Sequence, residues 1–313
     1  MPTFHTKTPV VFLVFNRPDT TIKVFEEIRR ARPPKLLLVA DGPRAEKAGE
    51  AEKCEAVRSI IETVDWPCEV LKNFSEVNLG CRKRISSGLD WAFDQVEEAI
   101  ILEDDCLPHP SFFRFCEELL ARYRDDERIF LISGDNYQFG RQRSKDSYYF
   151  SRYCHIWGWA TWRRSWRHYD ATISKWPLIK EGRWLQDILG DRNAFCYWTG
   201  IMDMVYEGKI DTWDYQLNLC SWLRNALNIM PNVNMVSNIG FGADATHDKN
   251  ESPLSNMAVS EMVFPLIHPD STIRDSIADA YTEAMQFRST FAGRLRKKVK
   301  SQVKSLIWNT PDR

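Results

Sequence analysis

The chain has 313 residues, 43% of them hydrophobic and 12% aromatic, which is enough for one large core or two smaller ones. Its formal net charge of −1 and isoelectric point near 6.6 provide no overall attraction to nucleic acid, so no nucleic-acid partner is expected. The longest N-terminal apolar run, Val10 to Phe15, is too short for a secretion signal, and no membrane span of about eighteen apolar residues occurs.

Strand and helix patterns alternate through the first third of the chain. The apolar runs typical of buried strands are Val10–Phe15, Lys35–Ala40, Cys68–Lys72 and Ala99–Leu102. Helical spacing of apolar residues separates them, over Asp19–Arg30 (with Asp19 as the expected N-cap), Ala51–Val64 and Ile85–Val96. This alternation predicts an α/β fold with a mostly parallel, Rossmann-like sheet flanked by helices.

Polar residues follow three of these strands, as Phe15-Asn16-Arg17, Asp41-Gly42 and Glu103-Asp104-Asp105. Because ligands of parallel sheets bind beyond the carboxyl ends of the strands, we expect the three groups to converge on one crevice. Two of them have simpler interpretations, since Arg17-Pro18-Asp19 could only start a helix and Asp41-Gly42-Pro43 could only form a turn.

The carboxylate triplet Glu103-Asp104-Asp105 lies between apolar residues on both sides. A salt-bridged surface loop is one interpretation, but a partly buried cluster of like charges calls for a cation or raised pKa values. Mg²⁺ and Mn²⁺ prefer one or two carboxylates together with the phosphate oxygens of a ligand. The triplet therefore predicts a divalent-cation site.

The pattern changes after about residue 128. Ile129–Ser133 is one more predicted strand, whereas Tyr148 to Trp222 is dense in Trp, Tyr, Arg and His. These aromatic residues indicate a second core or a platform that stacks on a sugar ring, and the core is the commoner case. No repeat or long linker interrupts the chain, so one domain with an elaborated C-terminal half is expected.

The ordered set of motifs over roughly residues 8–250 resembles the GT-A nucleotide-sugar-dependent glycosyltransferases, in particular the N-acetylglucosaminyltransferase I-like group and bacterial family 2-like relatives. The motifs are the segment Asn78-Leu79-Gly80-Cys81-Arg82-Lys83-Arg84, the triplet, Ser133-Gly134-Asp135-Asn136, Gly158-Trp159, Trp213-Asp214 and Gly240-Phe241-Gly242 with His247. The resemblance implies a nucleotide-sugar-binding half at residues 1–128, an acceptor and catalytic half at 129–270, and a tail at 271–313.

The resemblance also implies roles for individual residues of the donor site. Phe15, Asn16 and Arg17 stand at the first strand end, where the family contacts the nucleotide, and the Arg17 guanidinium can donate to phosphate. Asp41 stands where the family places a carboxylate against the uracil imide, so UDP-sugars are the expected donors.

For the metal, the resemblance implies that Asp105 is a ligand of Mn²⁺ or Mg²⁺. It places Asp104 as a ribose contact or a support for that ligand, and Glu103 beside them. Some GT-A enzymes complete the metal shell with a late histidine, which makes His247 a candidate, although a single histidine is more often structural.

An inverting reaction needs a carboxylate base across the crevice from the metal. In the family this base lies in a Trp-Asp-Asp-Trp setting, whereas this chain has Thr212-Trp213-Asp214-Tyr215-Gln216, which leaves the register open by one residue. Asp214 is the expected base and Asp211 the fallback. Asp214 could also be the N-cap of a helix over Tyr215–Asn225.

The C-terminal tail has an amphipathic pattern. Apolar residues form one helical stripe, and no acidic residue occurs from Ala284 to Thr310; the stripe comprises Phe287, Phe291, Leu295, Val299, Val303, Leu306 and Ile307, and the basic residues are Arg288, Arg294, Arg296, Lys297, Lys298, Lys300 and Lys304. Residues 288–308 therefore favour a basic amphipathic helix on an anionic membrane surface, and the alternative is a helix packed on its own domain.

Together these patterns predict a metal-dependent, inverting glycosyltransferase of polysaccharide or glycolipid assembly. Eight scattered cysteines without a CxxC pair favour reduced thiols and hence a cytoplasmic protein. The basic tail favours a peripheral position on the inner face of the membrane. One alternative is a sugar nucleotidylyltransferase, which would ordinarily have a glycine-rich phosphate loop after the first strand. The other is a non-catalytic, membrane-associated sugar-nucleotide-binding protein.

Overall fold

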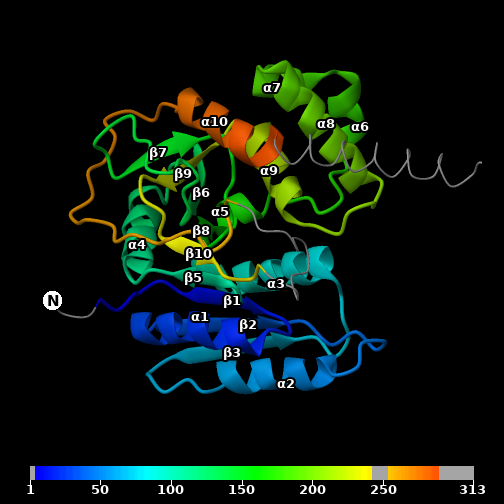
Figure 1. Cartoon of the computed structure of the whole chain (residues 1–313), viewed down its shortest axis with the longest axis vertical. Helices are drawn as coiled ribbons and strands as arrows, with labels where there is room; N and C mark the ends of the chain where they lie inside the picture. Colours follow the sequence, from blue (N-terminus) through cyan, green and yellow to red (C-terminus); the bar gives the residue numbers. More distant parts are fainter. Residues whose placement is uncertain (1–3, 242–252, 289–313) are drawn as a thin grey trace, which may run out of the picture.

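The computed structural model describes residues 4–241 and 253–288, and its centre is one eight-stranded sheet (Figure 1). In spatial order the strands are β3 (Glu69–Phe74), β2 (Lys35–Ala40), β1 (Val10–Val14), β4 (Glu98–Glu103), β8 (Trp159–Trp162), β6 (Ile129–Ser133), β9 (Leu227–Pro231) and β7 (Tyr148–Ser151). A separate antiparallel pair joins β5 (Cys106–Pro108) to β10 (Val236–Asn238).

The sheet is mostly parallel. Strands β3, β2, β1 and β4 run parallel to one another, and β6 and β9 run parallel to each other. Only β8 and β7 are antiparallel to the strands beside them. The carboxyl ends of β1, β2, β3 and β4 therefore lie along one edge, as the alternating strand and helix patterns require.

Helices cover both faces of the sheet. The helices are α1 (Pro18–Ala31), α2 (Glu50–Ile61), α3 (Cys81–Gln95), α4 (Ser111–Arg122), α5 (Arg163–Trp166), α6 (Trp176–Glu181), α7 (Trp184–Leu189), α8 (Arg192–Tyr206), α9 (Asp214–Leu223) and α10 (Ser276–Thr282), followed by the π-helix η1 (Glu283–Arg288). Helices α1, α2 and α4 share one apolar core with the sheet, and α3, α5 and α9 share the other. The prediction of a mostly parallel α/β fold is confirmed.

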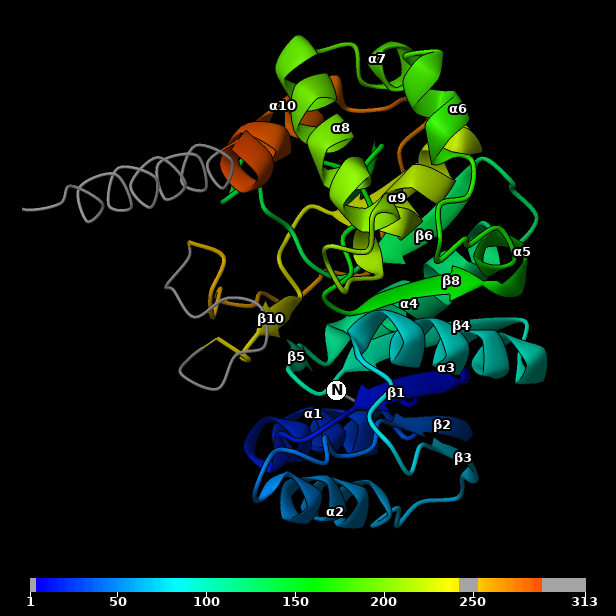
Figure 2. The same ribbon diagram turned by 90° about the vertical axis from the view of Figure 1, so that its right-hand side faces the viewer.

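Helices α6, α7 and α8 form an insertion at the end of the molecule opposite β3 and α2 (Figures 1 and 2). Its core contains Tyr153, Trp176 and Trp198, all less than 2% exposed. Most of the aromatic residues of this region are therefore buried, which supports the interpretation as a core, and Trp184 at 59% exposure is an exception.

The C-terminal helices pack on this insertion. Phe287 of η1 is 6% exposed and its ring lies 5.3 Å from that of Tyr153, 5.6 Å from Tyr197 and 4.7 Å from Trp198. The first member of the predicted apolar stripe thus packs on its own domain, and the stripe beyond Arg288 lies outside the described residues. Within residues 4–241 and 253–288, none of the helices has the length and apolarity needed to cross a bilayer.

Two helix starts differ from the prediction. Helix α1 begins at Pro18, and its N-cap, Arg17, makes no side-chain cap, so the expected Asp19 cap is wrong. The fixed φ of proline suits the first helical position, which moves Asp19 into the first turn. Helix α3 begins at Cys81 rather than Ile85. Its first turn is polar and has no apolar periodicity, so the sequence pattern did not predict it.

Phe287→Ala should lower the free energy of unfolding by about 3 kcal/mol, because it leaves a cavity among three aromatic rings. Ile277→Ala on the neighbouring α10 is the matched control, since Ile277 is 65% exposed and its removal should change stability by less than about 0.5 kcal/mol. Urea denaturation of the two variants measures this, and equal small losses would contradict the packing of η1.

Candidate active site

The ends of β1 and β4 bring two of the three predicted polar groups into contact. The strands are paired in parallel, with Leu13 opposite Glu103. One turn further, the Phe15 backbone N–H donates to Asp104 Oδ2 at 2.9 Å, and the Arg17 guanidinium forms an ion pair with Asp105. Parallel pairing in this register therefore places the nucleotide-contact residues of the prediction directly against the carboxylate triplet.

The triplet carries more negative charge than its surroundings neutralise. Burial raises the pKa of Glu103 well above its usual range, and repulsion from Asp105, Asp104 and Asp214 adds to the increase. Burial and then Asp105 also raise the pKa of Asp104. For Arg17, burial lowers the pKa while Asp105, Asp104 and Glu103 raise it, with a net increase. One guanidinium thus faces three carboxylates.

Asp41, at the end of β2, holds the loop that leads into α3. Its carboxylate accepts hydrogen bonds from the backbone N–H groups of Gly42 (2.9 Å) and Leu79 (3.0 Å) and from the Asn78 amide (3.0 Å). Burial raises its pKa, and the bonds from Leu79 and Gly42 oppose that increase. The turn interpretation therefore describes part of its role, and the carboxylate also joins β2 to the loop before α3.

Arg44 and Glu50 form a further polar pair beside Phe15, which the sequence did not single out. Glu50 is buried, binds the Arg44 side chain through both carboxylate oxygens, and accepts a hydrogen bond from the Asn16 amide at 2.9 Å. The Arg44 guanidinium lies 5.5 Å above the Phe15 ring. This pair fixes Asn16 and Phe15, and no local pattern announces it because its members come from a loop and a helix start.

Asp214 lies at the first position of α9, across from the triplet. The Thr212 hydroxyl donates to Asp214 Oδ1, and the helix N-cap is Trp213, so the alternative interpretation of Asp214 as the N-cap is wrong. Its charge contributes to raising the pKa values of Glu103 and Tyr137. Asp214 therefore lies near enough to the end of β4 to interact electrostatically with Glu103, although it comes from the other half of the chain.

Asp211, the alternative base, is engaged with backbone. Its Oδ2 accepts from the N–H of Cys81 at 2.9 Å and its Oδ1 from the N–H of Arg82 at 3.2 Å. The pKa of the Cys81 thiol is raised by burial and then by four nearby carboxylates. These carboxylates belong to Glu103, Asp214, Asp211 and Asp41. Carboxylates from both halves of the chain thus surround the first turn of α3.

Glycines allow the remaining motifs to pack beneath the site. The Gly134 N–H donates to the Gly158 carbonyl at 2.7 Å, and a Cβ on Gly134 would lie 2.6 Å from both Phe112 and Val236. A Cβ on Gly240 would collide with Asp105 Oδ2 and Arg17 Nη1. Gly134 and Gly240 are therefore places where backbone approaches the core or the triplet too closely for a side chain.

Asp135 of the same motif is fully buried and accepts hydrogen bonds from two ring systems. The Tyr137 hydroxyl donates to Oδ2 at 2.9 Å, and His155 Nδ1 lies 3.0 Å from Oδ1. Tyr137 and His155 stack with their centroids 4.3 Å apart. The cluster of Asp135, Tyr137 and His155 lies near enough to Asp214 for that carboxylate to affect the Tyr137 pKa. From the sequence, Asp135 was noted only as a member of the motif Ser133-Gly134-Asp135-Asn136.

The triplet fits a divalent cation by charge and by ligand type. Within the described ranges, no three His, Cys, Asp or Glu side chains come together as a metal cage. Mg²⁺ and Mn²⁺ need only one or two carboxylates when a diphosphate supplies the other oxygens. Burial and then mutual repulsion raise two carboxyl pKa values here, and a bound cation would favour the ionised forms. His247 lies outside the described residues.

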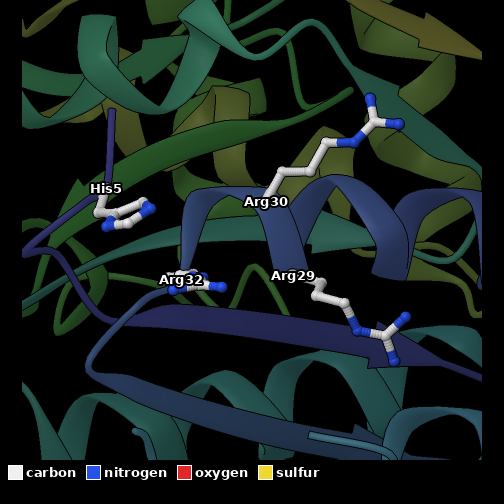
Figure 3. Close-up of a pocket in the computed structure, with 4 residues that line it drawn as sticks. All are labelled: His5, Arg29, Arg30 and Arg32. Carbon is white, nitrogen blue, oxygen red and sulfur yellow. The ribbon is translucent and has the colours of Figure 1, made fainter. Parts of the chain in front are cut away.

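A surface pocket elsewhere is not part of this site. It has a volume of about 580 Å³ and is lined by His5, Arg29, Arg30 and Arg32 at the carboxyl-terminal end of α1 (Figure 3). Helix α1 has 14 residues, so this end lies roughly 20 Å from the end that carries Arg17. Arg29 and Arg30 are engaged with Asp65 and Glu27, at 3.2 and 2.9 Å.

Comparison with known proteins yields distant structural likeness only. No family model matches the chain, and no curated protein matches it. Solved structures similar to it include the mannosyltransferase PcManGT from Pyrobaculum calidifontis in complex with GDP-Man and Mn²⁺, at 17% identity over 52% of this chain and 46% of that chain (TM-score 0.37). A UDP-glucose pyrophosphorylase complexed with UDP-glucose matches at 10% identity over 72% and 89% of the two chains (TM-score 0.34).

The glycosyltransferase GlyE from Streptococcus pneumoniae TIGR4 matches at 12% identity over 68% of this chain and 42% of that chain (TM-score 0.29). The chain thus spans less than half the length of the two transferases that it resembles. Similarity at this level assigns the chain to no family, including the N-acetylglucosaminyltransferase I-like group. Its function has to be argued from the residues of the site.

Asp104→Asn should raise the melting temperature at pH 8 in metal-free buffer. Because the pKa of Asp104 is raised in the folded state, the folded protein loses stability as the pH rises above the ordinary carboxyl range near about 4. The amide removes that charge and can still accept from the Phe15 N–H. The gain should shrink at pH 5, and Asp94→Asn at an exposed position of α3 is the control. A lower melting temperature for Asp104→Asn at pH 8 would contradict the excess of charge.

Proposed function

We propose that the chain is a metal-dependent, inverting glycosyltransferase that moves a sugar from a nucleotide donor to a hydroxyl group of a glycan or glycolipid. One observation carries the proposal: carboxylates from two distant parts of the chain lie close enough to interact electrostatically, those of the triplet at the end of β4 and that of Asp214 at the start of α9. Transfer with inversion needs these two functions, one at the leaving group and one at the attacking hydroxyl.

The donor half is built at the ends of β1 and β2. Phe15 offers a ring and Asp41 a carboxylate acceptor, which suits the N–H edge of a base such as uracil. Arg17 offers a guanidinium whose fork matches phosphate oxygens. Its present partner, Asp105, is the carboxylate that a cation would engage, so metal binding would release Arg17 toward the diphosphate.

The metal would be held by Asp105, with Asp104 fixed beside it through the Phe15 N–H. When bound, Mn²⁺ or Mg²⁺ supplies positive charge that stabilises a departing nucleoside diphosphate. The chain's own contribution is a charge-deficient, partly buried position at the end of a rigid strand. At such a position the carboxylates are already poorly solvated, so they would lose little hydration on binding a cation.

Asp214 would take the proton of the acceptor hydroxyl. The Thr212 hydroxyl fixes Oδ1, and among the described residues no hydrogen-bond donor reaches Oδ2, which is left for the acceptor. A sugar nucleotidylyltransferase has no use for a base in this position, and it would release diphosphate instead of a nucleoside diphosphate.

A thermal-shift panel of nucleotide sugars tests the donor site. UDP-sugars should raise the melting temperature only with Mn²⁺ present, since a ligand at 100 times its Kd adds about 2.7 kcal/mol of stability. Asp105→Ala should abolish this metal-dependent shift, because the diphosphate loses its bridging cation. The exposed Asp187→Ala on α7 should retain it. An unchanged shift in Asp105→Ala would move the metal site away from the triplet.

Asp214→Asn separates catalysis from donor binding. The amide keeps the size of the side chain but cannot accept a proton, so transfer should fall about 10²–10⁴-fold while the metal-dependent donor shift persists. The measurement is release of nucleoside diphosphate with a panel of acceptors. Retention of transfer within about twofold of the parent would rule out Asp214 as the base.

A further inference from the structure

The carboxylate of Asp211 caps a helix that lies 130 residues earlier in the chain. Helix α3 starts at Cys81, and its first two N–H groups, of Cys81 and Arg82, point to the two oxygens of Asp211. The first N–H groups of any helix have no partner within the helix, and an acidic side chain at that end also favours the helix dipole. The cap of α3 thus comes from the segment that leads into α9.

Gly80 makes this cap from outside possible. The N-cap position of α3 is Gly80, which has no side chain to accept from the helix, and its φ of +80° is in the left-handed region that favours glycine. A Cβ at Gly80 would lie 2.8 Å from Asp211 Oδ2. Gly80 therefore leaves the first N–H groups of α3 without a local cap, and it also leaves the space that the Asp211 carboxylate occupies.

Asp211 lies three residues before Asp214, and the residues between them are fixed. Thr212 donates its hydroxyl to Asp214, and the Trp213 carbonyl accepts from the Tyr169 hydroxyl at 3.1 Å. The Trp213 ring stacks on Trp159 with centroids 5.7 Å apart. This short segment is bonded to α3 through the Asp211 side chain and continues into α9 at its other end, so it has little freedom to move Asp214.

We propose that Asp211 is a positioning residue, which holds Asp214 at a fixed place relative to the donor half by capping α3 from the segment that leads into α9. The inference rests on the proposed function for its kinetic consequence. The contact itself, between the catalytic segment and the donor half, does not depend on turnover. Asp211 differs in this from a base, because both of its carboxylate oxygens are already bonded to backbone N–H groups.

Asp211→Ala should lower kcat about 10–100-fold, because a misplacement of about 1 Å at a reacting group costs up to about 10²-fold. The Kd of a UDP-sugar with Mn²⁺ should stay within about twofold, since the donor contacts lie on β1, β2 and β4. The acidic limb of the pH–rate profile should persist, because Asp214 still takes the proton. Asp211→Asn should restore most of the rate, since the amide oxygen can still accept from an N–H.

Asp191→Ala is the matched control. Asp191 caps α8, also 15 residues long, by accepting from the N–H groups of Asn193 (3.0 Å) and Ala194 (2.8 Å), but it does so within its own helix. Both alanine variants should lose about 2 °C in melting temperature. Only Asp211→Ala should lose rate. Gly80→Ala, which displaces the carboxylate without removing it, should reproduce the loss.

Amide hydrogen exchange gives a readout without turnover. Asp211→Ala should speed exchange in the first turns of both α3 and α9, whereas Asp191→Ala should speed exchange in α8 and leave α3 and α9 unchanged. Loss of exchange protection in α3 alone would mean that Asp211 is an ordinary helix cap, and this would overturn the proposal. A turnover rate for Asp211→Ala equal to that of Asp191→Ala would overturn it as well. Loss of the acidic limb in both Asp211 variants would overturn it in favour of Asp211 as the base. If the parent transfers no sugar, the proposed function fails, and exchange alone decides whether the segment is held.

Discussion

Three carboxylates at the end of β4, with one guanidinium against them, set the constraint on which the site depends. Glu103, Asp104 and Asp105 follow a strand that is buried on both faces, so their charges are poorly solvated. Arg17 compensates part of this charge. Such a cluster lowers stability locally, and binding of the proposed divalent cation with an anionic ligand would remove the repulsion.

The same edge of the sheet organises the rest of the site. Parallel pairing of β1, β2 and β4 brings Phe15, Asp41 and the triplet to one edge, and α3 starts from the loop that Asp41 holds. The second half of the chain then approaches through α9, whose leading segment contacts the first turn of α3. The segments to which we assign the donor and acceptor functions are therefore joined at one helix terminus.

Much of the fold could be predicted from local patterns. The strand Lys35–Ala40 has the predicted bounds, because its apolar run and the following Asp41-Gly42-Pro43 give both a hydrophobic and a turn signal. The first turn of α3 could not be predicted, since its residues are polar and its cap comes from Asp211. The pair of Arg44 and Glu50 could not be predicted either, because its place beside the site depends on tertiary contacts with Asn16 and Phe15.

By itself, the sequence determined which residue types follow the strands, and with them the α/β class and a site at the carboxyl ends. Hydrophobic periodicity and strand-end chemistry are local properties, readable over a few residues. Only the tertiary structure decided that Arg17 pairs with Asp105, that Asp211 is bonded to backbone while Asp214 faces the triplet, and that Phe287 packs among the aromatic rings of the insertion. These are contacts between segments tens to more than a hundred residues apart, and their partners are chosen by sheet register and helix packing, which no short stretch of sequence encodes.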